Sequence, residues 1–279
     1  MLTNKIKYIA ILSFPFLTLM SCDDNRPGES GNDHAEKKEI HVQVPPFDAD
    51  SAYMFVEDQV NFGPRVPNTK AHQACAEYLE QTLKRFTTDV TVQHFKARAY
   101  DGTILNSKNI IASFNPDKKA RVMLCAHWDS RPYADHDPDQ AHHETPILGA
   151  NDGASGVGVL LEVARQLKNH APNIGIDIIF FDSEDYGPPT DTQQHDETDF
   201  WGLGSQHWSK NPHVYDYKAR YAILLDMVGV ANPTFLMEGF SMHFAPDKVK
   251  KVWKIAHDIG YEEYFPEEPG GYITDDHYY

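Results

Sequence analysis

Apolar runs and amphipathic stretches alternate along the chain from about residue 45 onward. Residues 121–126 and 174–181 are largely apolar, as is typical of buried strands. Between them, residues 153–168 place apolar side chains at helical spacing. A strand, a long loop, a helix and a second strand, in this order, predict a βαβ unit, so part of the sheet should be parallel.

The same patterning predicts the remaining elements. Asp48 and Ser51 can cap a helix that runs towards Val60, and Thr69 can cap a second, amphipathic helix. Residues 61–67 between them must form a loop, because two prolines and a glycine exclude a helix there. Further strands are expected at residues 90–99, 109–114, 219–227 and 233–238, and a further helix at residues 246–259. These elements predict a single α/β domain with a central mixed β-sheet and helices on both faces.

The first residues have the features of an export signal. Lys5 and Lys7 precede a nearly continuous apolar stretch at residues 8–20, which is too short to span a bilayer as a mature helix. This stretch ends in Leu-Met-Ser-Cys at residues 19–22, which resembles the lipobox of bacterial lipoproteins, where the cysteine becomes the lipidated first residue. The alternative is an ordinary cleaved signal in which Cys22 has no role.

These features predict three parts of the chain. Residues 1–21 are expected to form a lipoprotein signal peptide, residues 22–44 a flexible polar tether, and residues 45–279 the folded domain. We therefore expect a protein of the bacterial cell envelope, held to a membrane by a lipid on Cys22, with its domain facing the periplasm or the cell exterior.

Composition narrows the possible functions. The 279 residues include 41% hydrophobic and 24% charged residues, which excludes wholesale disorder and a multi-span membrane protein. The net charge is −16, from 25 Lys and Arg against 41 Asp and Glu. A chain this acidic, without a basic stripe, is not expected to bind nucleic acid. Cys75 and Cys125 lie in apolar segments and are expected to be buried thiols, although a bridge between them remains an alternative.

Polar residues follow several of the predicted strands and the long loop before the predicted helix. In sheets of this kind, ligands bind beyond the carboxyl ends of the strands. The candidate residues there are His127, Asp152, Glu184, Asp185, Asp226 and Asp275. So much negative charge at one edge requires a cation, and carboxylate and imidazole ligands suit Zn²⁺. One carboxylate of an adjacent pair could bind the metal while its neighbour carries protons.

Three of the candidates also have a structural interpretation. Asp152 could cap the helix that follows it, Asp226 could accept a hydrogen bond from a backbone amide, and His127 could be a hydrogen-bonded, partly buried imidazole. Taken singly, these interpretations are at least as good as the functional one. Four clusters at successive strand ends favour a shared site.

Five segments together resemble glutaminyl cyclases of the animal and bacterial type, which are zinc enzymes that share a fold with the di-zinc aminopeptidases. The resemblance extends from about Phe47 to the end of the chain. The matching motifs are residues 61–67 (NFGPRVP), 127–132 (HWDSRP), 149–156 (GANDGASG), 180–185 (FFDSED) and 224–229 (LLDMVG). The order of the motifs makes the resemblance specific.

The resemblance implies a zinc-dependent glutaminyl-peptide cyclotransferase, which converts the N-terminal Gln of peptides and proteins to pyroglutamate and releases ammonia. Asp152 and Asp185 then look like two of the three ligands of a single Zn²⁺. Glu184 resembles the general base and acid, and Asp226 the carboxylate that holds the α-ammonium group of the substrate. Asp275 matches an Asp in the hydrogen-bond network near the metal.

The chain departs from this family at two points. Position 185 carries Asp where the family has Glu, so the metal would lie closer to its strand. The third zinc ligand of the family is a His expected beyond residue 279, so the C-terminal part of the domain is expected to be missing and the chain to be a fragment. The alternatives are that His277 or His127 replaces this ligand.

Two other functions remain open. In a di-zinc aminopeptidase, His127, Asp152 and Asp226 would hold one metal, Asp152 and Asp185 would share the second, and Glu184 would activate water. The long loop from His127 to Asp152 favours the cyclase, since it resembles that of bacterial cyclases. The other function is a non-catalytic surface lipoprotein that binds peptide N-termini. Trp128 and Trp201 either wall a small substrate pocket or pack in the core.

Overall fold

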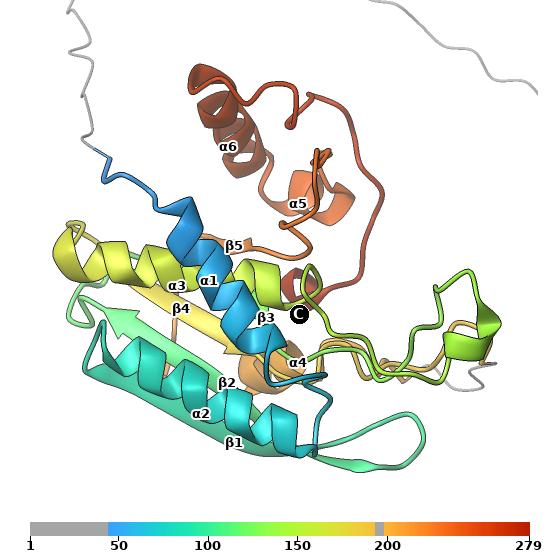
Figure 1. Cartoon of the computed structure of the whole chain (residues 1–279). Helices are drawn as coiled ribbons and strands as arrows, with labels where there is room; N and C mark the ends of the chain where they lie inside the picture. Colours follow the sequence, from blue (N-terminus) through green and yellow to red (C-terminus); the bar gives the residue numbers. More distant parts are fainter. Residues whose placement is uncertain (1–43, 193–197) are drawn as a thin grey trace, which may run out of the picture. The chain divides into compact units, whose positions relative to one another are not determined.

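The computed structural model describes residues 44–192 and 198–279, so the predicted signal peptide, Cys22 and the tether lie outside the described residues. A five-stranded sheet in the order β1-β2-β4-β3-β5 forms the centre of the domain (Figure 1). Its strands are β1 (Asp89–Arg98), β2 (Ile104–Phe114), β3 (Arg121–His127), β4 (Gly175–Phe181) and β5 (Ala222–Leu224). β1 and β2 are antiparallel, as are β2 and β4, whereas β3 runs parallel to both β4 and β5. The predicted mixed sheet and its βαβ unit are confirmed.

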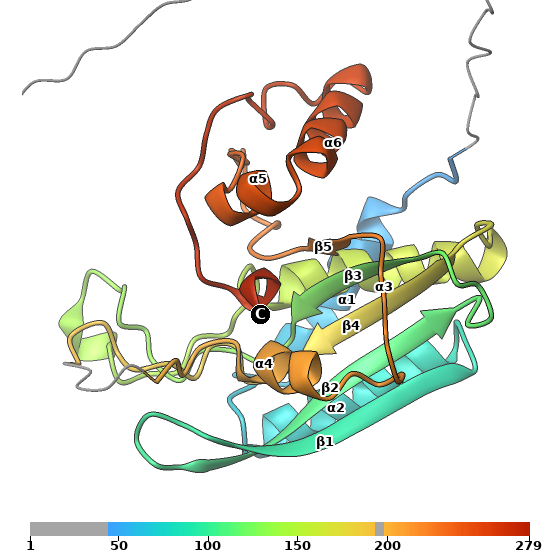
Figure 2. The same cartoon turned by 180° about the vertical axis from the view of Figure 1, so that it is seen from behind.

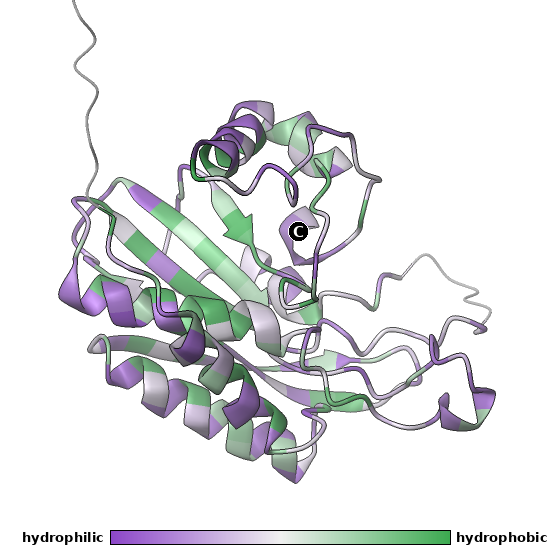
Figure 3. Cartoon of the chain, turned by 45° about the horizontal axis from the view of Figure 1, so that its top comes forward, coloured by the Kyte–Doolittle hydropathy of each residue, from purple (hydrophilic) through white to green (hydrophobic). Residues whose placement is uncertain are grey.

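Three helices cover one face of the sheet. They are α1 (Ala49–Val60), α2 (Lys70–Lys84) and α3 (Ala154–Asn169). The side chains of Asp48 and Thr69 accept the backbone N–H groups of Ser51 and His72, so both predicted helix caps are confirmed. Apolar residues of these helices and of β2, β3 and β4 form one continuous core. Figure 3 shows apolar residues concentrated on the central strands and polar residues on the outward sides of the helices.

A fourth helix covers the opposite face. α4 (Leu203–Lys210) packs Trp208 against a second, smaller cluster around Ile111, Cys125 and Phe181 (Figure 2). Helices therefore lie on both faces, as predicted. Cys75 belongs to the first core and Cys125 to the second, and both are free, buried thiols. The expectation of unbridged cysteines is confirmed.

The segment after β4 differs most from the sequence prediction. The strand expected at residues 219–227 is reduced to β5, and the chain turns at Met227, which has a φ of 49°. Residues 233–238 do not form a strand, and only Met237 makes a single bridge, to Pro269. α4 and α5 (Gly239–Phe244) were not predicted, whereas α6 (Pro246–Asp258) was. Within the described part of the chain, no helix is long and apolar enough to cross a membrane.

Candidate active site

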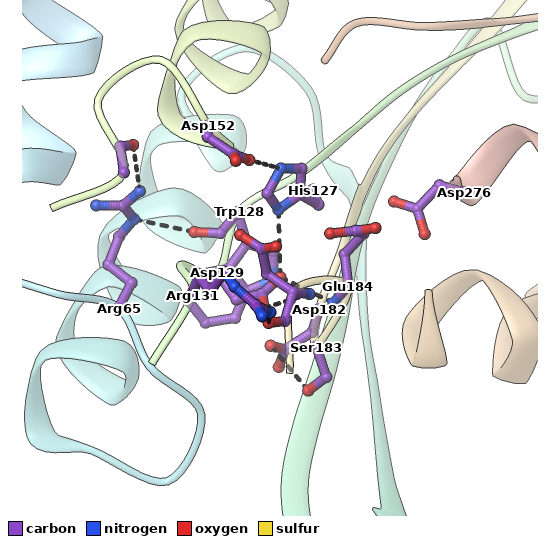
Figure 4. A network of polar contacts seen from close by, with 12 residues as sticks. Arg65, His127, Trp128, Asp129, Arg131, Asp152, Asp182, Ser183, Glu184 and Asp276 are labelled. Atoms are coloured by element: carbon purple, nitrogen blue, oxygen red, sulfur yellow. Dashed lines mark hydrogen bonds and ion pairs between the residues drawn. The ribbon is translucent and has the colours of Figure 1, made fainter. Parts of the chain in front are cut away.

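Parallel strands bring the predicted residues to one edge of the sheet. His127 is the last residue of β3, Glu184 and Asp185 follow β4, and Asp226 follows β5. Asp152 precedes α3, which connects β3 to β4. Figure 4 shows Asp152 pointing to His127, and the Glu184 carboxylate lying between His127 and Asp276. The structure therefore brings together the residues that the sequence placed at separate strand ends.

His127 is the centre of the cluster. Its Nε2 lies 2.9 Å from Asp152 Oδ1 and 3.2 Å from Asp226 Oδ1, and its Nδ1 lies 3.5 Å from Asp129 Oδ1. Burial lowers the pKa of His127, but the three carboxylates outweigh this effect and raise it well above the ordinary value. Burial raises the pKa of Asp226, while His127 more than compensates and lowers it. His127 therefore links carboxylates that follow β3 and β5 and that precede α3.

A glycine turn allows Asp152 to approach His127. Gly153 has a φ of 68°, and a Cβ at this position would lie 2.8 Å from the His127 ring and from its carbonyl oxygen. Any other residue would be strained and would push the turn away from the imidazole. The side chain of Asp152 does not cap α3, whose N-cap is Gly153 without a side-chain hydrogen bond. This result removes the helix-cap interpretation of Asp152.

Asp129 holds the backbone of the Glu184–Asp185 pair. Its two carboxylate oxygens accept the backbone N–H groups of Glu184 at 3.1 Å and Asp185 at 3.2 Å. The backbone N–H of Gly202 donates to the Glu184 carbonyl oxygen at 3.1 Å. The pair is thereby fixed from the end of β3 and from the start of α4. The sequence patterns assigned no role to Asp129. Its position two residues after a His at the end of a predicted strand could have indicated that it belongs to the site.

A buried layer below the pair supports a strained residue. Ser183 has a φ of 58°, and its hydroxyl lies 2.7 Å from that of Ser107. The preceding Asp182 lies 2.9 Å from His72 Nε2, and the His72 ring stacks on Trp128 at 4.4 Å. Trp128 is fully buried in the core and donates to a backbone carbonyl, so it packs beneath the site and does not wall a pocket.

The carboxylates are buried close together. Burial and the charge of Asp185 raise the pKa of Glu184 well above its ordinary value. Burial and the charge of Asp152 raise the pKa of Asp185 to about 8. Asp275 lies beside Asp226, and burial together with the charge of Asp226 raises its pKa. Asp276, which the sequence patterns did not single out, is also buried, and burial with the charge of Asp275 raises its pKa well above the ordinary range.

Two groups of side chains have the geometry of a metal site. One is His127, Asp152 and Asp226, and the other is His127, Glu184 and Asp185. Asp185 Oδ2 is buried and has no hydrogen-bond partner among the described residues, as expected of an oxygen suited to a cation. In the described part of the chain, no group of three contains both Asp152 and Asp185. The chemistry of the donor set suits a divalent metal.

His277 lies apart from both groups. Its Nε2 is 3.1 Å from Glu238 Oε2, and the Glu238 carboxylate also accepts backbone N–H groups of α5. It is therefore a hydrogen-bonded imidazole that fixes the loop carrying Asp275, and it does not replace a metal ligand here.

Comparisons with known proteins show the family of the chain. The sequence pattern of peptidase family M28 matches residues 109–279. A glutaminyl-peptide cyclotransferase of Drosophila melanogaster is 28% identical over 183 residues, covering 62% of this chain and 46% of its own length. This chain thus spans about half the length of that relative.

Two solved structures are more similar. The structure of Bacteroides thetaiotaomicron glutaminyl cyclase bound to N-acetylhistamine is 57% identical, with a TM-score of 0.83 over 85% of this chain and 81% of that one. A Zn-dependent exopeptidase from Parabacteroides distasonis has the same identity and TM-score, over 85% of this chain and 80% of that one. The chain shares their fold.

Proposed function

Because the chain belongs to peptidase family M28, we propose that it is a zinc-dependent glutaminyl-peptide cyclotransferase that acts on peptides and proteins with an N-terminal Gln. The observation that carries the proposal is the buried Glu184 carboxyl, which belongs to one candidate metal group with His127 and Asp185. Asp185 Oδ2 has no hydrogen-bond partner among the described residues. The similarity to a bacterial glutaminyl cyclase and to an animal cyclotransferase supports the choice of reaction.

Asp152 and Asp185 would hold the zinc ion, since each carboxylate shares a candidate metal group with His127. When bound, zinc supplies a Lewis acid that polarises the γ-amide carbonyl of the substrate Gln. The fit rests on the Asp185 oxygen that lacks a hydrogen-bond partner and on the oxygen and nitrogen donors around it.

The side chains of the chain would perform the proton transfers. Asp226 would hold the substrate α-amine near the γ-amide carbon. The amine nitrogen forms a bond to that carbon, the bond from the carbon to the amide nitrogen breaks, and ammonia leaves. Glu184 would take the proton from the amine and deliver it to the departing nitrogen. Both reacting groups belong to one residue. Holding the amine nitrogen against the amide carbon in a reactive orientation therefore accounts for much of the increase in the cyclisation rate.

A second candidate is a di-zinc aminopeptidase. The specific observation in its favour is the group formed by His127, Asp152 and Asp226, which could hold a metal of its own. Glu184 would then activate water, and the N-terminal residue would be removed.

The product of one peptide distinguishes these functions. The full chain, with added Zn²⁺, is incubated with a peptide that begins with Gln, and the product is weighed by mass spectrometry. Loss of one ammonia with the residue retained is the expected result. Loss of the whole first residue would establish the aminopeptidase, and an unchanged peptide that still binds the protein would favour a non-catalytic peptide-binding protein. A peptide that begins with Asn is the matched control, because its shorter side chain cannot form the same ring.

The attachment to a membrane is also a proposal. The sequence around Cys22 supports a lipid-anchored protein of the bacterial envelope with the domain facing the periplasm or the exterior. Cells that express the full chain are labelled with a fatty acid, and membrane fractions of wild type and Cys22→Ser are compared. The wild type should carry the label and sediment with membranes, and the variant should do neither. Equal labelling of the two proteins would contradict the anchor.

A further inference from the structure

The Arg131 side chain lies at the base of the candidate active site, and it is only 6% exposed. Its Nη1 donates to the carbonyl oxygens of Asp185 at 3.1 Å and Gly187 at 3.4 Å, and its Nη2 donates to that of Pro188 at 3.2 Å. Its Nε and Nη2 also form a two-pronged pair with Asp135, at 2.7 and 2.5 Å. One guanidinium thus binds three carbonyls of the segment that begins with Asp185.

These contacts complete the support of the Glu184–Asp185 pair. Asp129 accepts both backbone N–H groups of the pair, and the Gly202 N–H donates to the Glu184 carbonyl. Only the Asp185 carbonyl remains, and Arg131 is its donor. All four backbone polar groups of the pair therefore have partners, and Arg131 is the partner of the carbonyl of Asp185 itself.

Arg131 also joins the two ends of the segment between Asp185 and Trp201. Its guanidinium carbon lies 4.8 Å from the centre of the Trp201 ring. Gly187 packs against the same ring, since a Cβ there would overlap Trp201 Cε2. Asp135, the partner of Arg131, accepts the backbone N–H and the hydroxyl of Thr190 at 2.9 Å. The Arg131–Asp135 pair therefore contacts residues 185–190 and the Trp201 ring.

We propose that Arg131 is a positioning residue: by holding the Asp185 carbonyl, it fixes the direction of the Asp185 carboxylate and so sets the affinity of the site for zinc. The inference rests on the proposed function, since it assumes that Asp185 is a ligand. Lysine cannot replace Arg131, because an ammonium group cannot bind Asp135 in two places and reach three carbonyls in one plane.

Arg121 offers a matched control at the opposite end of β3. It also forms a two-pronged pair with a buried Asp, Asp177, at 2.7 and 2.6 Å. Its Nη1 also donates to three carbonyls, those of Asn115, Pro116 and Lys118. Arg121→Lys should therefore destabilise the fold in the same way as Arg131→Lys, without a contact to the candidate active site.

The experiment measures zinc affinity. The full-length wild type, Arg131→Lys and Arg121→Lys are stripped of metal, and each is titrated with Zn²⁺ against a fluorescent chelator, well below its unfolding temperature. We expect Arg131→Lys to bind zinc about 10- to 100-fold more weakly than the wild type, the range for groups that orient metal ligands. Arg121→Lys should bind zinc as the wild type does, with a lowered Tm.

The outcomes separate the two proposals. A wild type that binds no zinc would overturn the proposed metal site, and this inference with it. A wild type that binds zinc, with Arg131→Lys binding within twofold of it, would overturn the inference alone. An equal loss of affinity in Arg121→Lys would also overturn it, since the effect would then be one of general stability.

A milder pair of variants covers the case in which Arg131→Lys does not fold. Asp135→Asn keeps Arg131 and its carbonyl contacts but removes the charge that holds the guanidinium, and Asp177→Asn is its counterpart beside Arg121. Weaker zinc binding in Asp135→Asn but not in Asp177→Asn is expected. Unchanged zinc binding in Asp135→Asn, with Arg131→Lys unfolded, would overturn the inference.

Discussion

Asp129 accepts a hydrogen bond from the backbone N–H of Glu184 with a carboxylate oxygen at 3.1 Å, so the segment that follows β3 helps to fix the position of Glu184 after β4. Its second oxygen accepts the N–H of Asp185, and the side chain is fully buried. A carboxylate with two acceptor oxygens is the only common side chain of this size that can accept both amides.

Asp129→Asn should therefore damage both folding and catalysis. The new amide nitrogen would face a backbone N–H, leaving one buried donor without a partner at a cost of about 1–3 kcal/mol. Urea unfolding measures this loss, and the cyclisation rate of a Gln peptide should fall as Glu184 is released. A variant with wild-type stability and rate would show that Asp129 does not hold the pair.

Glu184→Gln should remove cyclisation and leave the fold intact. Positioned proton transfer contributes roughly 10²- to 10⁴-fold to a rate, so the rate should fall by about this factor. Burial raises the pKa of Glu184, so that replacing the carboxyl by a neutral amide should leave the Tm unchanged or higher. Glu144→Gln, at an exposed loop position, is the control and should match the wild type. A Glu184→Gln variant that still releases ammonia at the wild-type rate would exclude Glu184 as the proton carrier.

Gly156 brings α3 against the segment that carries Asp226. A Cβ at Gly156 would overlap the Leu225 carbonyl oxygen and lie 3.0 Å from Ala126 Cβ. Gly156→Ala should push Leu225 and Asp226 away from His127, destabilise the fold by about 1–3 kcal/mol and raise the KM for a Gln peptide.

Gly271→Ala is the control for this substitution. Among the described residues, none apart from its chain neighbours lies within 4 Å of the Cβ position of Gly271, and its backbone is not left-handed. Thermal unfolding and steady-state kinetics of the two variants should differ clearly. Equal, near-wild-type values would show that the segment after β5 can shift without affecting the site.

Much of this arrangement was predictable, because the signals were local. The βαβ unit follows from two apolar strands and a helical stretch between them, and Asp48 and Thr69 cap their helices through backbone amides three residues away. Residues at the ends of parallel strands must meet at one edge. The strand-end positions of His127 and Asp226 are therefore enough to predict that the two residues share a site.

The rest depended on contacts between distant segments. Apart from Asp135, the partners of Arg131 are backbone carbonyls, which any residue type supplies, so no sequence pattern reveals them. Residues 233–238 are apolar enough for a strand, yet only Met237 finds a bridge partner. β5 ends at Leu224 because the chain must turn to bring Asp226 to His127. In each case, tertiary contacts override the local pattern.

The loop that carries Asp275 should respond to acid through Glu238. Burial raises the pKa of Glu238, but backbone N–H groups of Ser241, Phe240 and Ile273 outweigh it and lower the pKa to about 2. As the pH falls from about 4.3, the ordinary pKa of Glu, the unfolded chain takes up a proton that the folded chain does not. Stability that is present above about pH 4.3 is therefore lost progressively towards about pH 2.

Glu238→Gln tests this dependence. At about pH 6 the variant should be less stable than the wild type by about 1.5–3 kcal/mol, the range for hydrogen bonds to a charged group. At about pH 3 the difference should shrink, because the wild type has lost part of the contribution. Urea unfolding at the two pH values gives both numbers. A difference that stays constant with pH would mean that the charge of Glu238 does not stabilise the loop.

Native mass spectrometry of the full chain during the reaction tests most directly whether it is a cyclase that uses one zinc ion. The protein is loaded with Zn²⁺, its metal content is read from the intact mass, and the product of a Gln peptide is weighed in the same sample. The proposed cyclase predicts one zinc per active chain and a peptide that has lost only ammonia. Two zinc ions per active chain, with a peptide shortened by its first residue, would contradict it and make the His127, Asp152 and Asp226 group the second metal site of an aminopeptidase.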